Sequence, residues 1–385
     1  MRQLAHWSLV MIVVSALSPQ KVEAKPRARD LGVPFDGVPG ANNAITDVPG
    51  VEVGHATIIS GAGKLDVGKG PVRTGVTAVL PRGRNASAPA FAGWFSLNGN
   101  GEMTGTTWIE ESGLLEGPVL LTNTTSVGTV RDAAIKWWLA HHKQAQPWLL
   151  PVVAETYDGH LNDTHGFHVR EQHVFAALDS AQTGPLLEGN VGGGTGMCCF
   201  EFKGGIGTAS RKVARPSENY AVGVLVQANF GARGQLQIAG VPVGREIPES
   251  TFRSKEMGSI IIVVATDAPL LPHQLKRLAR RAALGLARTG STAGNGSGDI
   301  FVAFSTANPQ AANATGLVNL TMLPNESLNG LFEATVQATE EAIINALVAA
   351  ETMTGRDDHR VIALPHDRLR DVLKKYNRLV DSNAK

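Results

Sequence analysis

The feature that most constrains this chain is a set of short apolar runs that predict strands buried on both faces. The clearest are SIIIVVA at 259–265, VGVLVQAN at 222–229 and LLPVVA at 149–154. Consecutive β-branched and aliphatic residues are typical of strands covered by other layers, because a half-exposed strand alternates apolar with polar residues. We therefore expect helices packed over buried sheets.

The rest of the sequence predicts several helices and further strands. Residues 130–144 predict a helix with Ala133, Trp137 and Ala140 on its apolar face, and the leucines of 271–290 line one face of another. Further helices are expected at 173–181, at 330–355 with Gly355 closing it, and at 364–380. Shorter strands are expected at 50–58, 74–81 and 117–123.

Length and charge bear on the class of partner. The 385 residues suffice for one large domain or two medium ones. The formal net charge is +1 with both signs interspersed, and aromatic residues make up only 5% of the chain. A nucleic-acid-binding surface is expected to be basic, and a single-strand site rich in aromatics. We therefore expect no nucleic-acid partner.

The N-terminus predicts a signal peptide over residues 1–24, with a short buried helix as the alternative. Arg2 precedes an apolar core at 7–17 that is too short to span a bilayer, and Ala24 offers a small residue for cleavage. No later segment is apolar enough to span a membrane. We expect an exported, periplasmic protein without membrane contact once the signal is removed.

Two other signals predict ordinary structure rather than chemistry. Cys198 and Cys199 are adjacent, so they do not predict a conventional disulfide and are expected to act as small buried hydrophobes. The glycine run at 190–196 lacks the third glycine of a dinucleotide-binding loop, because Met197 stands there. We expect turn glycines and no nucleotide cofactor.

A histidine-rich segment raises a metal-site alternative. The side chains concerned are His160, Asp163, His165, His168 and His173. Zinc is bound by such groups, but no HExxH-type spacing is present. We expect these residues to be solvated or hydrogen-bonded and the protein to bind no metal; a metallohydrolase remains a third possibility, after the two alternatives given below.

The residue pair Gly258-Ser259 carries the chemical hypothesis. A serine hydroxyl is a weak nucleophile that needs an adjacent base. Cleavage before Ser259 would create a free α-amine on the same residue, whose unperturbed pKa of about 7.7–8.0 suits a general base. Gly258 would permit unusual backbone angles at the cut. A flexible joint before a strand is the alternative interpretation.

Polar residues at neighbouring strand ends could complete such a site. Asn229 ends one buried strand and could donate its amide to an oxyanion. Ser297 and Asp299 precede another strand and could reach the nucleophile if that strand lies beside Ser259, although turn chemistry also explains them. Glu155 and Tyr157 follow the buried strand at 149–154.

Together these motifs resemble the L-aminopeptidase/D-amidase-D-esterase and β-aminopeptidase family of self-cleaving serine peptidases. The matching stretches include ITDVPGVEVGHATI, VVAETYDG, FKGGIGTASR, VLVQANFG, GSIIIVVATDAP and GNGSGDIFVAFST, in that order. The resemblance implies an α+β fold, a four-layer αββα sandwich like that of N-terminal-nucleophile hydrolases with different connectivity. It also implies one catalytic domain cut into residues 25–258 and 259–385, with these αβ units forming homo-oligomers, tetramers being favoured.

The resemblance also assigns roles. Ser259 would be the nucleophile after self-cleavage behind Gly258, Asn229 the oxyanion donor, and Tyr157 a neighbour of the reacting carbonyl. Ser297 and Asp299 match the family's serine and acidic positions, although some members carry Glu at the latter. Glu155 stands where a carboxylate could hold the substrate's ammonium group. The implied substrates are short peptides, amides or esters with a free N-terminal amine, hydrolysed through an acyl-enzyme without a cofactor.

Two alternatives and one open question accompany this interpretation. The chain could be an acyltransferase on a similar scaffold, or a non-catalytic exported binding protein with the same fold. Related self-cleaving transferases typically use threonine as the nucleophile and are cytoplasmic, and Ser259 and the predicted signal peptide at residues 1–24 argue against that alternative. Preference among α-L-, β- and D-amino acids depends on pocket shape, which the sequence does not reveal.

Overall fold

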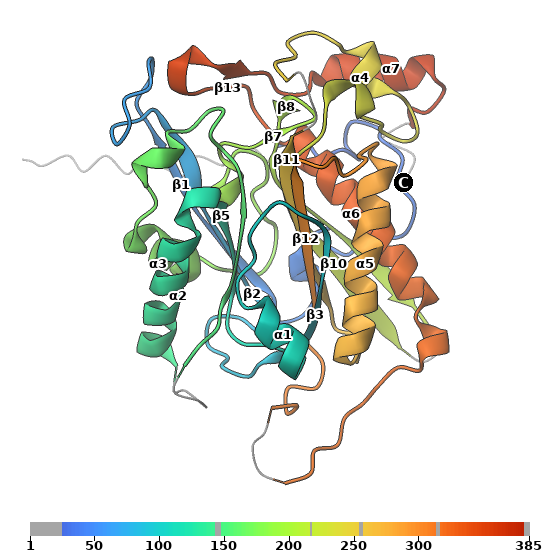
Figure 1. The fold of residues 1–385 in the computed structure, drawn as a ribbon. Coiled ribbons are helices and arrows are strands. Elements are labelled where there is room, and N and C mark those ends of the chain that lie inside the picture. The colour runs from blue at the N-terminus through green and yellow to red at the C-terminus, as the bar shows by residue number, and fades with distance from the viewer. Residues whose placement is uncertain (1–24, 143–147, 216–217, 254–256, 313–315, 381–385) are drawn as a thin grey trace, which may run out of the picture.

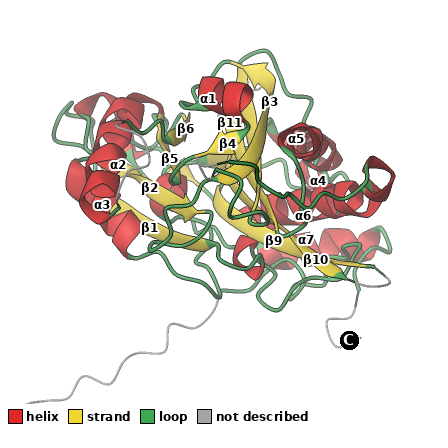
Figure 2. Cartoon of the chain, turned by 90° about the horizontal axis from the view of Figure 1, so that it is seen from below, coloured by secondary structure: helices red, strands yellow, loops and turns green. Residues whose placement is uncertain are grey.

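The computed structural model describes residues 25–142, 148–215, 218–253, 257–312 and 316–380. Two sheets pack face to face, and helices cover the outer face of each, which gives the order helix, sheet, sheet, helix (Figures 1 and 2). The predicted αββα sandwich is therefore confirmed. The predicted signal peptide at residues 1–24 lies outside the described residues.

The smaller sheet has four strands in the order β1-β2-β5-β6. Their bounds are Glu52–Ser60, Val72–Leu80, Val119–Asn123 and Val152–Thr156. Helices α2 (Val127–His141) and α3 (Glu171–Asp179) cover its outer face, where Trp137 is buried beneath them.

The larger sheet has six strands in the order β4-β3-β12-β11-β10-β9. In that order they span Leu114–Leu115, Ala90–Gly99, Ser297–Ser305, Gly258–Thr266, Asn219–Asn229 and Gly205–Ala214. Only β11 and β12 pair in parallel among these strands. Helices α5 (Pro272–Arg288) and α6 (Asn329–Val348) cover the outer face.

Shorter elements complete the described chain. The helices are α1 (Thr106–Ser112), α4 (Val243–Glu246) and α7 (His366–Lys375). Two small hairpins are β7 (Cys198–Cys199) with β8 (Phe202–Lys203), and β13 (Met353–Thr354) with β14 (Arg360–Val361). These hairpins lie at the upper end of the molecule in Figure 1, the end at which β11 begins.

The burial of strand β11 on both faces explains its composition. Ile260 and Ile262 pack in the core beneath α5 and α6, whereas Ile261 and Val263 pack in the core between the two sheets. Both faces of the strand are therefore buried, which is why it carries no alternating polar residues. By the same alternation, the side chain of Ser259 faces the space between the sheets.

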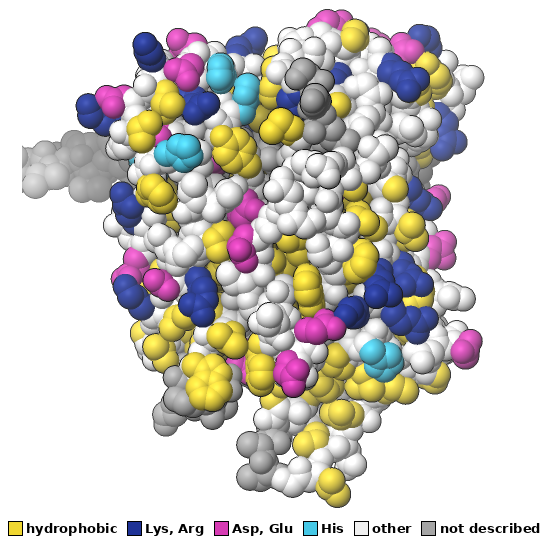
Figure 3. Space-filling model, viewed as in Figure 1, with side chains coloured by type: hydrophobic (Ala, Val, Ile, Leu, Met, Phe, Trp, Pro, Cys, Tyr) yellow, Lys and Arg dark blue, Asp and Glu magenta, His cyan; other side chains and the backbone are white. Residues whose placement is uncertain are grey.

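Helix α5 shows the one-sided pattern expected of a covering helix. Leu275, Leu278 and Ala282 are buried against the sheet. Lys and Arg side chains gather over this helix on the right of the space-filling view (Figure 3). The basic residues are Lys276, Arg277, Arg280 and Arg281.

Two expectations about helices were wrong in detail. Ala140 is exposed, because the buried face of α2 includes Val130, Ala134 and Trp138 instead. Gly355 does not close α6, which ends at Val348. Its role is close packing, because a Cβ atom on Gly355 would lie 2.1 Å from the carbonyl oxygen of Leu161.

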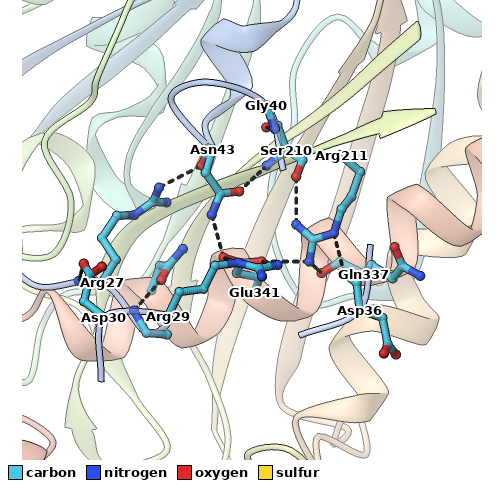
Figure 4. A network of polar contacts seen from close by, with 12 residues as sticks. Arg27, Arg29, Asp30, Asp36, Gly40, Asn43, Ser210, Arg211, Gln337 and Glu341 are labelled. Carbon is cyan, nitrogen blue, oxygen red and sulfur yellow. Dashed lines mark hydrogen bonds and ion pairs between the residues drawn. The ribbon is translucent and has the colours of Figure 1, made fainter. Parts of the chain in front are cut away.

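A buried ion network ties the N-terminal segment to the larger sheet and to α6 (Figure 4). Glu341 of α6 pairs with Arg211 of β9 at 2.7 Å and with Arg29 at 2.8 Å. Asn43 also donates to Glu341, at 2.6 Å. Glu341 and Arg211 are almost fully buried, and removing one partner of such a pair destabilises a fold strongly.

Two further expectations concern burial. Cys198 and Cys199 are buried free thiols, which confirms their prediction as small buried hydrophobes. In the part of the chain that the structure describes, no helix has the length and apolarity needed to cross a bilayer.

Candidate active site

Ser259 lies near the start of β11, between the ends of two neighbouring strands. Its register partners are Asn229 at the end of β10 and Gly298 at the beginning of β12. The N–H of Gly298 donates to Ser259 Oγ at 3.1 Å, and the side chain is only 5% exposed. A hydrogen-bonded strand end therefore presents the hydroxyl.

Gly258 has a backbone conformation that few other residues adopt. Its φ is +130°, and a Cβ atom placed there would lie 1.8 Å from the carbonyl oxygen of Asn229. Glycine is thus required sterically at the residue before Ser259. Strained or unusual backbone at such a position is common in sites that perform chemistry on the chain.

Two contacts fix the orientation of the Asn229 amide. Its Oδ1 accepts from the N–H of Cys198 at 2.8 Å, and its Nδ2 donates to the carbonyl of Tyr157 at 2.8 Å. An amide nitrogen carries two hydrogens, so Asn229 keeps a second donor in addition to the one used on Tyr157. The geometry permits the donor function that the sequence suggested.

Ser297 and Asp299 lie on the strand beside Ser259, as the sequence interpretation required. The Ser297 hydroxyl donates to Asp299 Oδ1 at 2.6 Å, and both residues are buried. Their register partners are Gly258 and Ile260, so their side chains point to the face of the sheet opposite to that of Ser259. The β12 contact to Ser259 Oγ comes from Gly298, which stands between them.

Glu155 supplies a buried carboxylate close to this strand end. It is the residue before Thr156, the last residue of β6, and is only 3% exposed. The backbone N–H of Glu102 donates to Oε1 at 3.0 Å, and the Thr124 hydroxyl donates to Oε2. Burial raises the pKa of Glu155 above its ordinary value, although both hydrogen bonds oppose the shift.

One cavity of about 570 Å³ joins these groups. It is large enough for a small ligand. The predicted residues on its wall are Glu155, Tyr157, Asn229, Gly258 and Ser259, with Tyr157 48% exposed. Ser297 and Asp299 are not among the lining residues, which fits their opposite face.

The remaining residues of the cavity wall were not assigned to this site from the sequence, although His160 was named as a metal-ligand candidate. These residues are Asn100, Thr124, Gly159, His160, Phe252, Arg253, Met257, Gly296 and Arg356. They come from loops far apart in the chain, so no local pattern brings them together. The local signals were the polar run that follows β5, which contains Thr124, and the histidine-rich segment, which begins with His160.

The histidine-rich segment does not form a metal centre in the described residues. His168 contacts the Asp163 carboxylate at 2.8 Å, and His173 accepts from the N–H of Arg170 at 3.0 Å. His160 stacks on Phe252 instead, with ring centroids 4.1 Å apart. Within the described ranges, no three His, Cys, Asp or Glu side chains gather as potential metal ligands.

The fold and this site define a class of protein. A serine at the end of a central strand, in a cavity between two sheets of an αββα sandwich, is the arrangement of a serine hydrolase with an N-terminal-nucleophile type of fold. The chain matches the model of peptidase family S58 over residues 43–361.

Similar proteins and solved structures support the same class of protein. The chain is 58% identical over 370 residues to the β-peptidyl aminopeptidase BapA of Sphingosinicella microcystinivorans, covering 92% of this chain and 93% of that one. It superposes with a TM-score of 0.87 and 50% identity on the L-aminopeptidase D-Ala-esterase/amidase of Ochrobactrum anthropi, covering 92% and 100%. That structure is described as a prototype for the serine aminopeptidases and a new variant of the Ntn hydrolase fold. A Burkholderia sp. β-aminopeptidase matches with a TM-score of 0.83 and 49% identity, over 91% and 99%.

The chain belongs to peptidase family S58. It is a serine-type aminopeptidase, and the alternative of a non-catalytic binding protein is set aside.

Proposed function

We propose that this aminopeptidase cleaves its own chain between Gly258 and Ser259 and then uses Ser259 to release N-terminal β-amino acids from short peptides. The observation that carries the proposal is the position of Ser259. Its hydroxyl is held by the Gly298 N–H at a strand end, in one cavity with a buried carboxylate and an oriented amide. Those are the groups needed for acyl transfer from a substrate with a free amine.

Self-cleavage would begin with attack of Ser259 Oγ on the Gly258 carbonyl carbon. The C–O bond forms as the C–N bond to Ser259 breaks, and the nitrogen gains the proton lost by the hydroxyl. The product is an ester on Ser259 with a free α-amine on the same residue. Water then hydrolyses the ester, which leaves a carboxylate on Gly258 and restores the hydroxyl.

The φ of +130° at Gly258 supports this step and gives a direct test. We expect Gly258→Ala to reduce the rate of self-cleavage at least tenfold, because the added Cβ would collide with the Asn229 carbonyl, 1.8 Å away. The cut fraction is measured by intact mass over time after rapid purification. Gly128→Ala is the control, since its Cβ would meet no atom within 4 Å. Cleavage of both variants at the wild-type rate would contradict this role.

Turnover would repeat the same chemistry on a substrate. The Ser259 α-amine takes the hydroxyl proton as Oγ attacks the scissile carbonyl, and the second Nδ2–H of Asn229 stabilises the oxyanion. Collapse releases the leaving amine, which carries away the proton. Water then opens the acyl-enzyme by the reverse path. Glu155 holds the ammonium group of the substrate, which selects unblocked N-termini.

The cut would not separate the two pieces. Strands β11 and β12 of the second piece lie between β10 and β3 of the first, so the sheet is shared. The Glu341 network adds ion pairs from residues 259–385 to Arg29 and Arg211 of residues 25–258. We propose that the two chains stay together as one αβ unit, that these units assemble into tetramers, and that the protein is exported to the periplasm.

The preference for β-amino acids rests on the named relatives, since the β-peptidyl aminopeptidase is 58% identical over 92% of this chain. The test compares β-alanyl, L-alanyl and D-alanyl p-nitroanilides with N-acetyl-β-alanyl p-nitroanilide. We expect the β-alanyl compound to give the highest kcat/KM and the acetylated compound to be at least about 100-fold slower, because it carries no ammonium group for Glu155. Faster hydrolysis of the L- or D-compound would assign a different substrate class, and equal hydrolysis of the acetylated compound would remove the aminopeptidase specificity.

A further inference from the structure

The cavity around Ser259 has charges of opposite sign on its two sides. Glu155 lies on the β12 side, because the loop at residues 100–102 contacts both. The Glu102 N–H donates to Glu155 Oε1 at 3.0 Å, and the Asn100 N–H donates to the Ser297 carbonyl at the start of β12 at 3.3 Å. Arg253 lies on the β10 side, where its Nη1 donates to the carbonyls of Met257 at 2.7 Å and Gly231 at 3.3 Å. Because the strand order is β12-β11-β10, Ser259 stands between the acidic and the basic side.

A second guanidinium reinforces the basic side. Arg356 lines the same cavity from the turn between β13 and β14. Its Nε is buried and has no hydrogen-bond acceptor among the described residues. The carboxylate of Asp357 is 3.9 Å away and is shared with the N–H of Leu65. The Arg356 side chain is 27% exposed, and its terminal nitrogens donate no hydrogen bond among the described residues, so they are free to hold a ligand that supplies acceptors.

The turn that carries Arg356 is held in place from behind. The Arg356 N–H donates to the carbonyl of Leu161 at 2.9 Å. His359, in the same turn, bonds the His160 carbonyl through Nδ1 at 2.9 Å and stacks on the His160 ring with centroids 4.7 Å apart. Phe252 stacks on the other side of His160 at 4.1 Å. Histidine side chains are visible at this upper end of the molecule (Figure 3).

The His160 ring, which lines the cavity, adds no competing charge. The pKa of His160 is lowered to about 4, first by burial and then by the positive charges of His359, Arg253 and Arg356. His160 is therefore neutral at pH 7. Among the described lining residues, the charged groups are then Glu155 on one side of Ser259 and Arg253 and Arg356 on the other.

We infer that Arg356, with Arg253 beside it, forms a subsite for the free C-terminal carboxylate of the leaving group. This inference rests on the proposed function, and it names the substrate class more closely: short peptides, dipeptides above all, that end in a free carboxylate. Guanidinium is the side chain best suited to hold a carboxylate, through two parallel N–H···O bonds. A dipeptide bound by its ammonium group at Glu155 and its carbonyl at Ser259 directs its carboxylate toward this basic side.

The test compares kcat/KM for β-alanyl-L-alanine and for its C-terminal amide, which differ only in the carboxylate. We expect wild-type enzyme to prefer the acid about tenfold, the usual scale for one charge-assisted contact at a half-exposed site. We expect Arg356→Gln to bring the ratio of kcat/KM for the acid to kcat/KM for the amide close to one. The loss should appear mainly as a higher KM for the acid. Arg356→Glu makes the amide the better substrate. Arg356 is the residue to change, because Arg253 also contacts Met257 next to the proposed cut.

Controls make each outcome decisive. Arg131→Gln, on the outer face of α2, is the matched control and keeps the wild-type ratio. Thermal unfolding and intact mass show that each variant is folded and cut. Equal kcat/KM for acid and amide in the wild type would overturn the carboxylate subsite while leaving the proposed function standing. The same proportional loss for both compounds in both Arg356 variants would also overturn it. Hydrolysis of neither compound by wild-type enzyme would refute the proposed function, and the subsite with it.

Discussion

Purified Ser259→Ala is expected to remain a single uncut chain and to hydrolyse free-amine substrates at least about 10⁴-fold more slowly than the wild type. The substitution removes the hydroxyl that, in the proposed mechanism, attacks the Gly258 carbonyl and forms the acyl-enzyme. Wild-type protein should give two masses that divide the chain after Gly258. An intact-mass spectrum of both proteins, beside a progress curve with β-alanyl p-nitroanilide, measures both effects.

The fold should survive this change, so loss of cleavage is informative. In the described structure, Ser259 Oγ accepts one hydrogen bond, from the Gly298 N–H, and its loss is small on the scale of a folded domain. Ser291→Ala, whose hydroxyl accepts only the nearby Ala293 N–H in the described contacts, is the matched control. Cleavage that persists in Ser259→Ala would mean that another protease cuts the chain. An uncut wild type that is fully active would exclude the N-terminal-nucleophile mechanism.

The residues that sequence alone could place are those at the ends of strongly patterned strands. Runs of β-branched residues bounded by glycine gave β10 and β11 nearly complete, so Asn229 and Ser259 could be assigned to strand ends. Their contact follows from pairing that no single segment encodes. The structure adds that Asn229 and Ser259 are direct register partners.

Other parts of the site depend on which distant segments meet. Phe252 and Arg356 are about a hundred residues apart and have ordinary surroundings in the sequence, yet both line the cavity. Strand β3 was not predicted, because glycine and polar residues interrupt its apolar run, although it pairs with β12. Gly298 carried no signal of its own. Its role follows from the β11–β12 register, which brings its N–H within hydrogen-bond distance of Ser259 Oγ.

The proposed role of Glu155 would make substrate selection depend on its protonation. Burial raises the pKa of this carboxyl, whereas the Glu102 N–H and the Thr124 hydroxyl favour its charged form. Only the charged form can pair with a substrate ammonium group. As the pH falls through the raised pKa, Glu155 becomes neutral, and we expect kcat/KM to fall. This acid limb lies at higher pH than an exposed glutamate would give.

We expect Glu155→Gln to lower kcat/KM for β-alanyl p-nitroanilide by about 10²- to 10³-fold, with most of the effect in KM. In the variant the amide oxygen can still accept from the Glu102 N–H, and the amide nitrogen can donate to the Thr124 hydroxyl oxygen. The substrate's ammonium group is nevertheless left without a charged partner in a buried site, which typically costs about 2–5 kcal/mol. The ratio of rates on free and N-acetylated substrates should collapse in the variant. Steady-state kinetics with both substrates measures the change.

The pH profile of kcat/KM distinguishes the ionisation of Glu155 from that of the proposed base, the α-amine of Ser259. The proposed α-amine of Ser259 must also lose a proton, so in the wild type log kcat/KM should fall with a limiting slope of about two at low pH. In Glu155→Gln the carboxyl ionisation is gone and only the amine remains, so the slope should fall to about one. Glu110→Gln is the control, because Glu110 pairs with Lys276 on the surface. A Gln variant with wild-type KM and an unchanged slope would show that the ammonium group binds elsewhere in the cavity.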